Sequence, residues 1–230
     1  MSSSSEQTAA AGPVLARAHR DRRPYRLGEE IANSVTHGVG IAGAIAALVA
    51  LTVFATRAHD GFKLAGAIVF GISLVVEYSA STLYHALPGR AKHVLKILDH
   101  AGIYVLIAGS YTPFTLVTIR EHGGWWLFGA IWGFAVLGIA FEAFWTYRPG
   151  WVSAVIYLGM GWAVIFTMKP LLAALAAAGL WLLVAGGVAY TAGTPFYVFK
   201  RVPYFHMVWH LWVIAGSALH VLAVLLYVVR

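Results

Sequence analysis

The stretch from residue 205 to residue 229 reads FHMVWHLWVIAGSALHVLAVLLYVV. It contains no Lys, Arg, Asp or Glu, and it is longer than the roughly 20 apolar residues that cross a bilayer as a helix. We therefore expect a transmembrane helix here, with His206 and His210 near its beginning.

Stretches of the same kind fill most of the chain before residue 205. Reading apolar runs against charged residues, Gly and Pro places six further spans near 31–56, 63–87, 95–119, 124–146, 151–168 and 170–193. The break at Lys169-Pro170 is the weakest, and merging the spans on either side of it would leave six in all. The sequence predicts an all-α integral membrane protein in which residues 26–230 form a seven-transmembrane-helix bundle.

The composition agrees with the bilayer as solvent. Hydrophobic residues make up 60% of the chain and charged residues 11%, whereas a soluble domain has about 25% charged residues. Residues 1–25 lack the apolar core of a signal peptide, and we expect a flexible basic tail there. With no cysteine, any transition-metal site must use His with carboxylate or water.

The basic residues indicate the orientation of the chain. The net charge is +7, but most Lys and Arg lie in short loops between spans, which argues against nucleic acid as a partner and for membrane lipids. One side of the bundle receives Arg17, Arg20, Arg22, Arg23, Arg26, Arg90, Lys92, Lys96, Arg148, Lys200 and Arg201. The other receives Arg57, Lys63, Arg120, Lys169 and Arg230. This bias predicts a plasma (inner) membrane protein with a cytoplasmic N-terminus and an outside C-terminus.

Ionisable residues within the spans gather at the predicted cytoplasmic side. Each costs roughly 2.5 to 3.5 kcal/mol at the centre of a span, so each is a candidate functional residue. The four groups are Glu29, Glu30, Asn33 and His37 on the first span, Glu77, Ser81 and His85 on the second, Asp99 and His100 on the third, and His206 and His210 on the seventh. Their agreement in depth predicts one shared site.

The histidine spacing favours a metal site. His206 and His210 are four residues apart and share a helix face, so both imidazoles can bind one ion. His85 from the second span would complete the three-ligand pattern of a catalytic zinc, leaving a fourth position for water. The alternative is that these histidines only form hydrogen bonds inside the bundle.

The remaining polar residues have two interpretations each. Asp99 either pairs with Arg90 or Lys96, or binds a metal ligand or the metal's water. Ser81 either bonds back to the Glu77 carbonyl or serves the site as an oxyanion donor.

The polar residues other than Asp99 and Ser81 also have a structural and a functional interpretation. Glu30, Asn33 and His37 are either helix-start residues or support the metal ligands. Glu142 either reaches the site or extends to the interface, whereas His220, roughly 15 Å deeper than His210, is expected to be a hydrogen-bonded core residue.

Four motifs combine these residues: E-x-x-N-x-x-x-H ending at His37, S-T-L-Y-H ending at His85, L-D-H-A-x-I-Y-x-L-I-A-G-x-Y-T-P-F from Leu98, and H-x-x-W-H from His206. Together they resemble the bacterial hemolysin III family, which is related to the progestin and adiponectin receptor (PAQR) family and more distantly to alkaline ceramidases. The resemblance implies seven helices and a zinc held by His85, His206 and His210, with Ser81 and Asp99 lining the site.

The leading functional hypothesis is a zinc-dependent hydrolase of a lipid amide or ester, in which Asp99 orients or deprotonates water and Ser81 holds the oxyanion. Glu77 and His100 are expected around the site with Glu30, Asn33 and His37. The alternative is a non-enzymatic sensor or regulator of the membrane with structural zinc. Pore formation is disfavoured by the apolar spans, and transport has only Glu77 and Glu142 as candidate proton carriers.

Overall fold

The computed structural model describes residues 25–230, and every regular element within that range is helical. The predicted tail therefore lies, apart from Tyr25, outside the described residues. Seven helices in the described part are long and apolar enough to cross a membrane, which confirms the predicted fold class. They are α2 (Leu27–Arg57), α3 (Gly61–Ala86), α4 (Ala91–Pro113) with a π-helical continuation to Thr118, α5 (Trp125–Phe144), α6 (Gly150–Gly161) continued by α7 (Met168–Ala174), α8 (Ala177–Val198) and α9 (Phe205–Tyr227).

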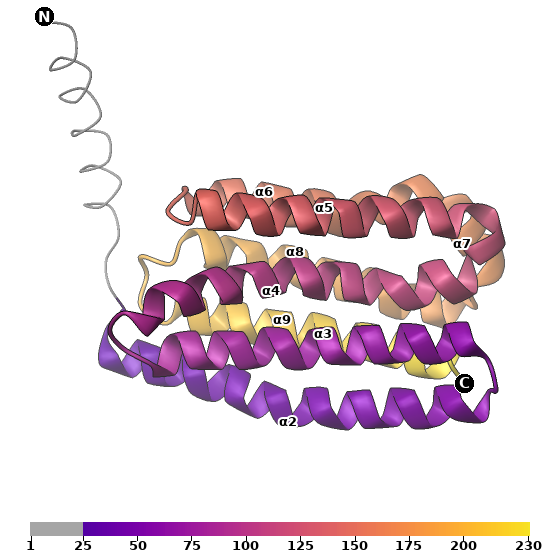
Figure 1. Cartoon of the computed structure of the whole chain (residues 1–230), viewed down its shortest axis with the longest axis horizontal. Coiled ribbons are helices and arrows are strands. Elements are labelled where there is room, and N and C mark those ends of the chain that lie inside the picture. The colour runs from indigo at the N-terminus through magenta and orange to yellow at the C-terminus, as the bar shows by residue number, and fades with distance from the viewer. Residues whose placement is uncertain (1–24) are drawn as a thin grey trace, which may run out of the picture.

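The helices run side by side along the long axis of the molecule (Figure 1). Helix α2 packs against α3 and α9, α3 packs against α4, and α8 packs against α9. Helices α2, α4 and α9 begin at the same end of the bundle, and α3 ends there. We call this the triad end, because it holds the histidines described below. The C-terminus lies at the opposite end.

Large apolar side chains cover the outside of the bundle. Phe144 is 91% exposed, Phe166 80% and Trp181 72%. In water such a surface would be an aggregation liability, whereas in lipid it meets a matching solvent. The exposed surface therefore supports the same conclusion as the hydropathy of the spans.

The predicted break between the fifth and sixth spans is wrong in position. The chain does not stop at Lys169-Pro170: a 3-10 segment, Trp162–Thr167, passes directly into α7, and the break follows at Leu175 and Ala176. Pro170 is the third residue of α7, within the first turn, where a helix needs no backbone N–H from it. The fifth span, Gly150–Ala174, is consequently as long as the others.

Small residues let the helices carrying the polar groups come close together. A Cβ added to Gly102 of α4 would lie 2.2 Å from Oε2 of Glu77 on α3. One added to Gly138 of α5 would lie 2.3 Å from the Tyr104 ring on α4. Both glycines therefore allow direct contact between neighbouring spans.

Candidate metal centre

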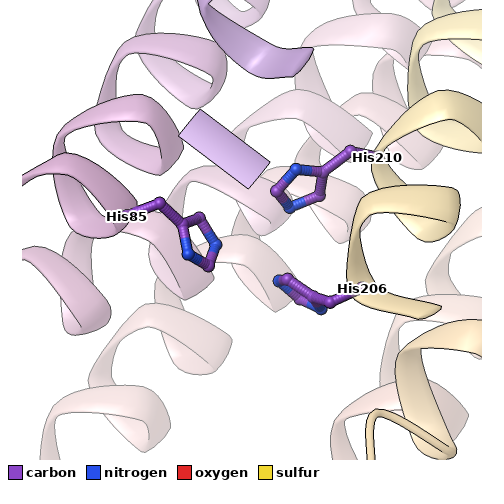
Figure 2. Close-up of side chains that lie close together, drawn as sticks. All are labelled: His85, His206 and His210. Atoms are coloured by element: carbon purple, nitrogen blue, oxygen red, sulfur yellow. The ribbon is translucent and has the colours of Figure 1, made fainter. Parts of the chain in front are cut away.

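Three histidines from two helices meet at the triad end. His85 lies at the end of α3, and His206 and His210 lie on the first turns of α9. Each offers a ring nitrogen, and these atoms all lie within 4.8 Å of one another. All three side chains are buried, and Figure 2 shows their rings turned toward a common point. This triad can bind a metal ion.

The tautomers of two triad residues are set by their neighbours. Nδ1 of His85 lies 2.7 Å from Oε2 of Glu30, and Nδ1 of His210 lies 3.3 Å from the backbone oxygen of Asn33. Because each of these oxygens accepts a hydrogen bond, Nδ1 carries the proton and Nε2 keeps its lone pair. Nε2 of His85 is buried and has no partner among the described residues. A metal ligand with its other nitrogen bonded to a carboxylate or a carbonyl is the usual arrangement in metal sites.

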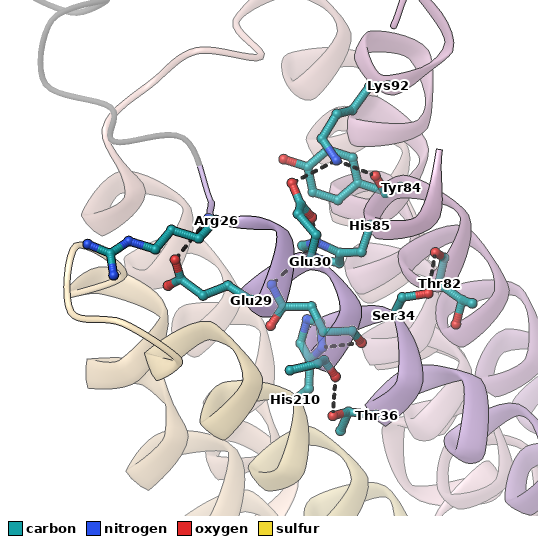
Figure 3. Close-up of polar contacts among 12 residues, drawn as sticks. Arg26, Glu29, Glu30, Ser34, Thr36, Thr82, Tyr84, His85, Lys92 and His210 are labelled. Atoms are coloured by element: carbon teal, nitrogen blue, oxygen red, sulfur yellow. Dashed lines mark hydrogen bonds and ion pairs between the residues drawn. The ribbon is translucent and has the colours of Figure 1, made fainter. Parts of the chain in front are cut away.

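Glu30 also joins the triad to the turn between α3 and α4. Its Oε1 lies 2.8 Å from Nζ of Lys92, which in turn donates to the backbone oxygen of Tyr84 (Figure 3). The side chain of Asn33 approaches Nδ1 of His85 at 3.4 Å. Helix α2 thus supplies support for both His85 and His210.

His37, also on α2, lies against the triad on the side toward the membrane interior. Its ring stacks on that of His210, with centroids 3.7 Å apart and an interplanar angle of 15°. It is buried, and neither ring nitrogen has a partner among the described residues. His37 is therefore a candidate for a fourth protein ligand.

Tyr25 lies on the other side of the triad and was not identified from the sequence. Its ring stacks on His206 at 5.3 Å and meets His85 edge-on at 5.7 Å. Burial, followed by the electrostatic effects of Tyr84, Tyr197, Asp99 and Glu30, raises the pKa of the Tyr25 hydroxyl well above its usual range. Only its place two residues before the first span could have pointed to it.

Glu29 was named from the sequence only as part of the first polar group. Its carboxylate accepts hydrogen bonds from the backbone N–H of Arg26, at 2.9 Å, and of Tyr204, at 3.1 Å. It therefore ties the beginning of α2 to the loop that precedes α9.

Ser81 and Glu77 lie one and two turns before His85 on α3, and Asp99 lies on α4. Ser81 is wholly buried one turn before His85, and its Oγ has no hydrogen-bond partner among the described residues. The bond back to the Glu77 carbonyl considered from the sequence is thus not formed. Asp99 is buried close enough to Tyr25 to affect its pKa. Glu77 is buried against Gly102, with Oε2 unpartnered among the described residues.

His100 belongs to a second polar cluster instead of contacting the triad directly. Its Nδ1 lies 2.8 Å from Oε1 of Glu142, and Glu142 forms an ion pair with Arg148. Arg148 also donates to the hydroxyl of Tyr104 at 3.3 Å. Glu142 therefore neither reaches the triad nor extends to the interface. The cluster joins α4 to the end of α5.

Two adjoining cavities lie within the bundle. The nearer is lined by Glu77, Trp209 and Val213. His220 lines both cavities and donates from Nε2 to the backbone oxygen of Leu183, as expected for a core histidine. Trp209 and Val213 neighbour His210 along α9, but none of the three triad histidines lines either cavity.

Comparisons with known proteins agree over most of the chain. The family model described as Haemolysin-III related matches residues 25–221. The chain is 42% identical over 207 residues to the Hemolysin-3 homolog of Bacillus subtilis (strain 168), covering 90% of this chain and 97% of that protein. It is 41% identical over 201 residues to Hemolysin-3 of Bacillus cereus, covering 87% and 92%. It is 26% identical over 216 residues to the human Monocyte to macrophage differentiation factor, covering 88% and 85%. No solved structure matches.

Proposed function

The chain belongs to the Haemolysin-III related family of multi-pass membrane proteins, and from that premise and the buried triad we propose a zinc-dependent hydrolase of a lipid amide or ester bond. The family expected from the four motifs is confirmed, and the human relative supports its relationship to the PAQR family. Neither the names of these relatives nor their similarity specifies a reaction.

The observation that carries the proposal is the fit of the triad to zinc. Zinc binds histidine nitrogen at 2.0–2.1 Å, which in a tetrahedral site separates the nitrogens by roughly 3.4 Å. The three nitrogens lie within 4.8 Å of one another, so movements on the order of 1 Å close the difference. The unpartnered Nε2 of His85 and the carboxylate on its Nδ1 are what such a ligand requires.

Bound zinc would supply Lewis-acid chemistry, which lowers the pKa of water to about 7 and polarises a carbonyl group. The residues around the triad then have defined tasks. Glu30 holds the ring of His85 in position through Nδ1. Asp99 accepts a proton from the attacking water, and the free hydroxyl of Ser81 donates to the oxygen that gains charge.

The cavity beside the triad suits a substrate that comes from the bilayer. Its walls include Ile103, Leu106, Ile107 and Leu158, and these side chains match an acyl chain. The excess of Lys and Arg at the triad end favours a cytoplasmic position for that end, in the plasma (inner) membrane. A lipid of the inner leaflet would then place its amide or ester near the zinc.

A second candidate function is non-enzymatic regulation of the membrane, with zinc only joining helices. The observation that favours it is His37, whose buried, unpartnered ring nitrogens lie beside His210. If His37 became a fourth ligand, the site would be closed, and closed sites are typical of structural zinc.

Hydrolysis is tested by incubating zinc-loaded protein with a defined panel of lipid amides and esters and measuring released fatty acid by mass spectrometry. We expect release by the wild type and about a hundred-fold loss in Asp99→Asn, because a positioned proton acceptor contributes 10²–10⁴-fold. Asp60→Asn, at the opposite end, is the matched control. Zinc-loaded wild type that releases no fatty acid from any lipid of the panel would contradict the proposal, and loss of zinc in His37→Ala would favour the structural alternative.

A further inference from the structure

The triad has an aromatic cover at the end of the bundle. Tyr25 precedes α2 and contacts two of the three triad rings, stacking on His206 at an interplanar angle of 28° and meeting His85 at 61°. His37 lies on the opposite side of the triad, against His210. Because α2 begins two residues after Tyr25 and then enters the bundle, the Tyr25 ring lies between the triad and the end of the molecule.

Hydrogen bonds to Glu29 fix the segment that carries Tyr25 against the loop before α9. The Glu29 carboxylate accepts the N–H of Arg26, next to Tyr25, and the N–H of Tyr204, two residues before His206. The same two segments are close elsewhere, since a Cβ on Gly28 would lie 3.1 Å from the Tyr204 hydroxyl. Glu29 is buried, so its hydrogen bonds are protected from water. The position of the Tyr25 ring is therefore fixed relative to α9.

A cavity also lies within the bundle, near the beginning of α9. The nearer cavity is lined by Trp209 and Val213, which flank His210 on α9, and by Glu77 on α3. It continues to His220, ten residues further along α9 and therefore roughly 15 Å deeper. The triad thus has the Tyr25 ring on one side and the His37 ring on the other.

We propose that Tyr25 is a residue of the metal site, whose ring covers the triad at the end of the bundle and keeps water-soluble ligands away from a bound metal. This inference rests on the proposed function in one respect, that the triad holds a metal. Water-soluble ligands then reach the metal only when the Tyr25 ring moves away. An apolar chelator dissolved in the membrane does not have to pass this ring.

The test measures release of zinc from protein in lipid nanodiscs to two chelators. EDTA stays in water, whereas 1,10-phenanthroline enters the bilayer. We expect wild type to release zinc to phenanthroline faster than to EDTA. Tyr25→Ala is expected to release zinc to EDTA at least about ten-fold faster than wild type, because it loses two ring contacts that hold the closed state. Tyr25→Phe keeps the ring and is expected to match wild type.

Tyr147→Ala is the matched control, because Tyr147 stacks on His93 at 5.6 Å at the same end, and neither residue belongs to the triad. Glu29→Gln is a second variant that leaves the ring unchanged. One amide oxygen replaces a carboxylate that holds two N–H groups, so EDTA is expected to remove zinc faster than in wild type.

Wild type that loses zinc to EDTA as fast as to phenanthroline would overturn the inference. So would Tyr25→Ala and Glu29→Gln variants whose EDTA rates equal that of wild type. A wild type that binds no zinc would instead overturn the proposed function, so the two failures are distinguishable.

Discussion

Replacing Glu30 tests how the triad holds its metal. Its Oε2 lies 2.7 Å from Nδ1 of His85, and its side chain is 17% exposed, so the hydrogen bond is largely shielded from water. Glu30→Gln leaves an amide oxygen that still accepts this bond but removes the charge. Glu30→Ala removes the bond altogether. Both changes leave the three ligands in place.

The magnitude follows from the strength of that bond. Hydrogen bonds to charged groups contribute about 1.5–3 kcal/mol, and 1.4 kcal/mol corresponds to a ten-fold change in Kd. Loss of partners behind metal ligands weakens binding by about 10- to 100-fold in known sites. We expect Glu30→Gln to raise the Kd for zinc about ten-fold and Glu30→Ala about a hundred-fold.

The assay is a competition titration of purified protein against a fluorescent zinc chelator at neutral pH. Glu121→Gln is the matched control, because Glu121 pairs with Arg120 at the opposite end and its side chain is 77% exposed. The control is expected to bind zinc as wild type does. Unchanged affinity in both Glu30 variants would refute the conclusion that His85 holds the metal with support from Glu30.

Three further predictions concern the triad, the second cluster and the helix packing. Zinc content measured after dialysis should fall as the solution is acidified from neutral pH, because protons compete with the metal for the imidazole nitrogens; content that stays unchanged down to about pH 3 would argue against histidine ligands. Glu142→Gln should lower the free energy of unfolding by about 3–5 kcal/mol, because it leaves the buried Arg148 charge without its carboxylate partner; chemical denaturation measures this, and a loss no larger than that of Glu121→Gln would contradict it. Gly138→Ala should destabilise by about 1–3 kcal/mol, because its Cβ would meet the Tyr104 ring at 2.3 Å; Gly133→Ala, on the same helix with nothing within 4 Å, should not, and equal melting temperatures would refute the packing argument.

The sequence was sufficient for the spans because hydropathy over about 20 residues responds to the bilayer alone. It misplaced the break at Pro170, since proline interrupts a helix only beyond its first turn, and the start of α7 depends on the preceding 3-10 segment. The breaks with several polar residues, such as Arg57 to Gly61, were placed within a few residues of the observed ends.

The triad could be predicted because topology and helix periodicity bring His85 to the depth of His206 and His210. The orientation of the His100 side chain could not be predicted, because it depends on the rotation of α4 about its axis and on Glu142 from another helix. Tyr25 was missed for a similar reason. An aromatic residue at an interface has many possible partners, and only the packing of α2 against α9 puts its ring on His206.

The most direct test of the account is the zinc content of the purified protein, determined by elemental analysis without added zinc, for wild type and for His206→Ala/His210→Ala. The account predicts about one zinc per wild-type chain, from the three-ligand site, and none in the double variant. A well-folded wild type without zinc, or a double variant that keeps it, would contradict the claim that these three histidines form a zinc site.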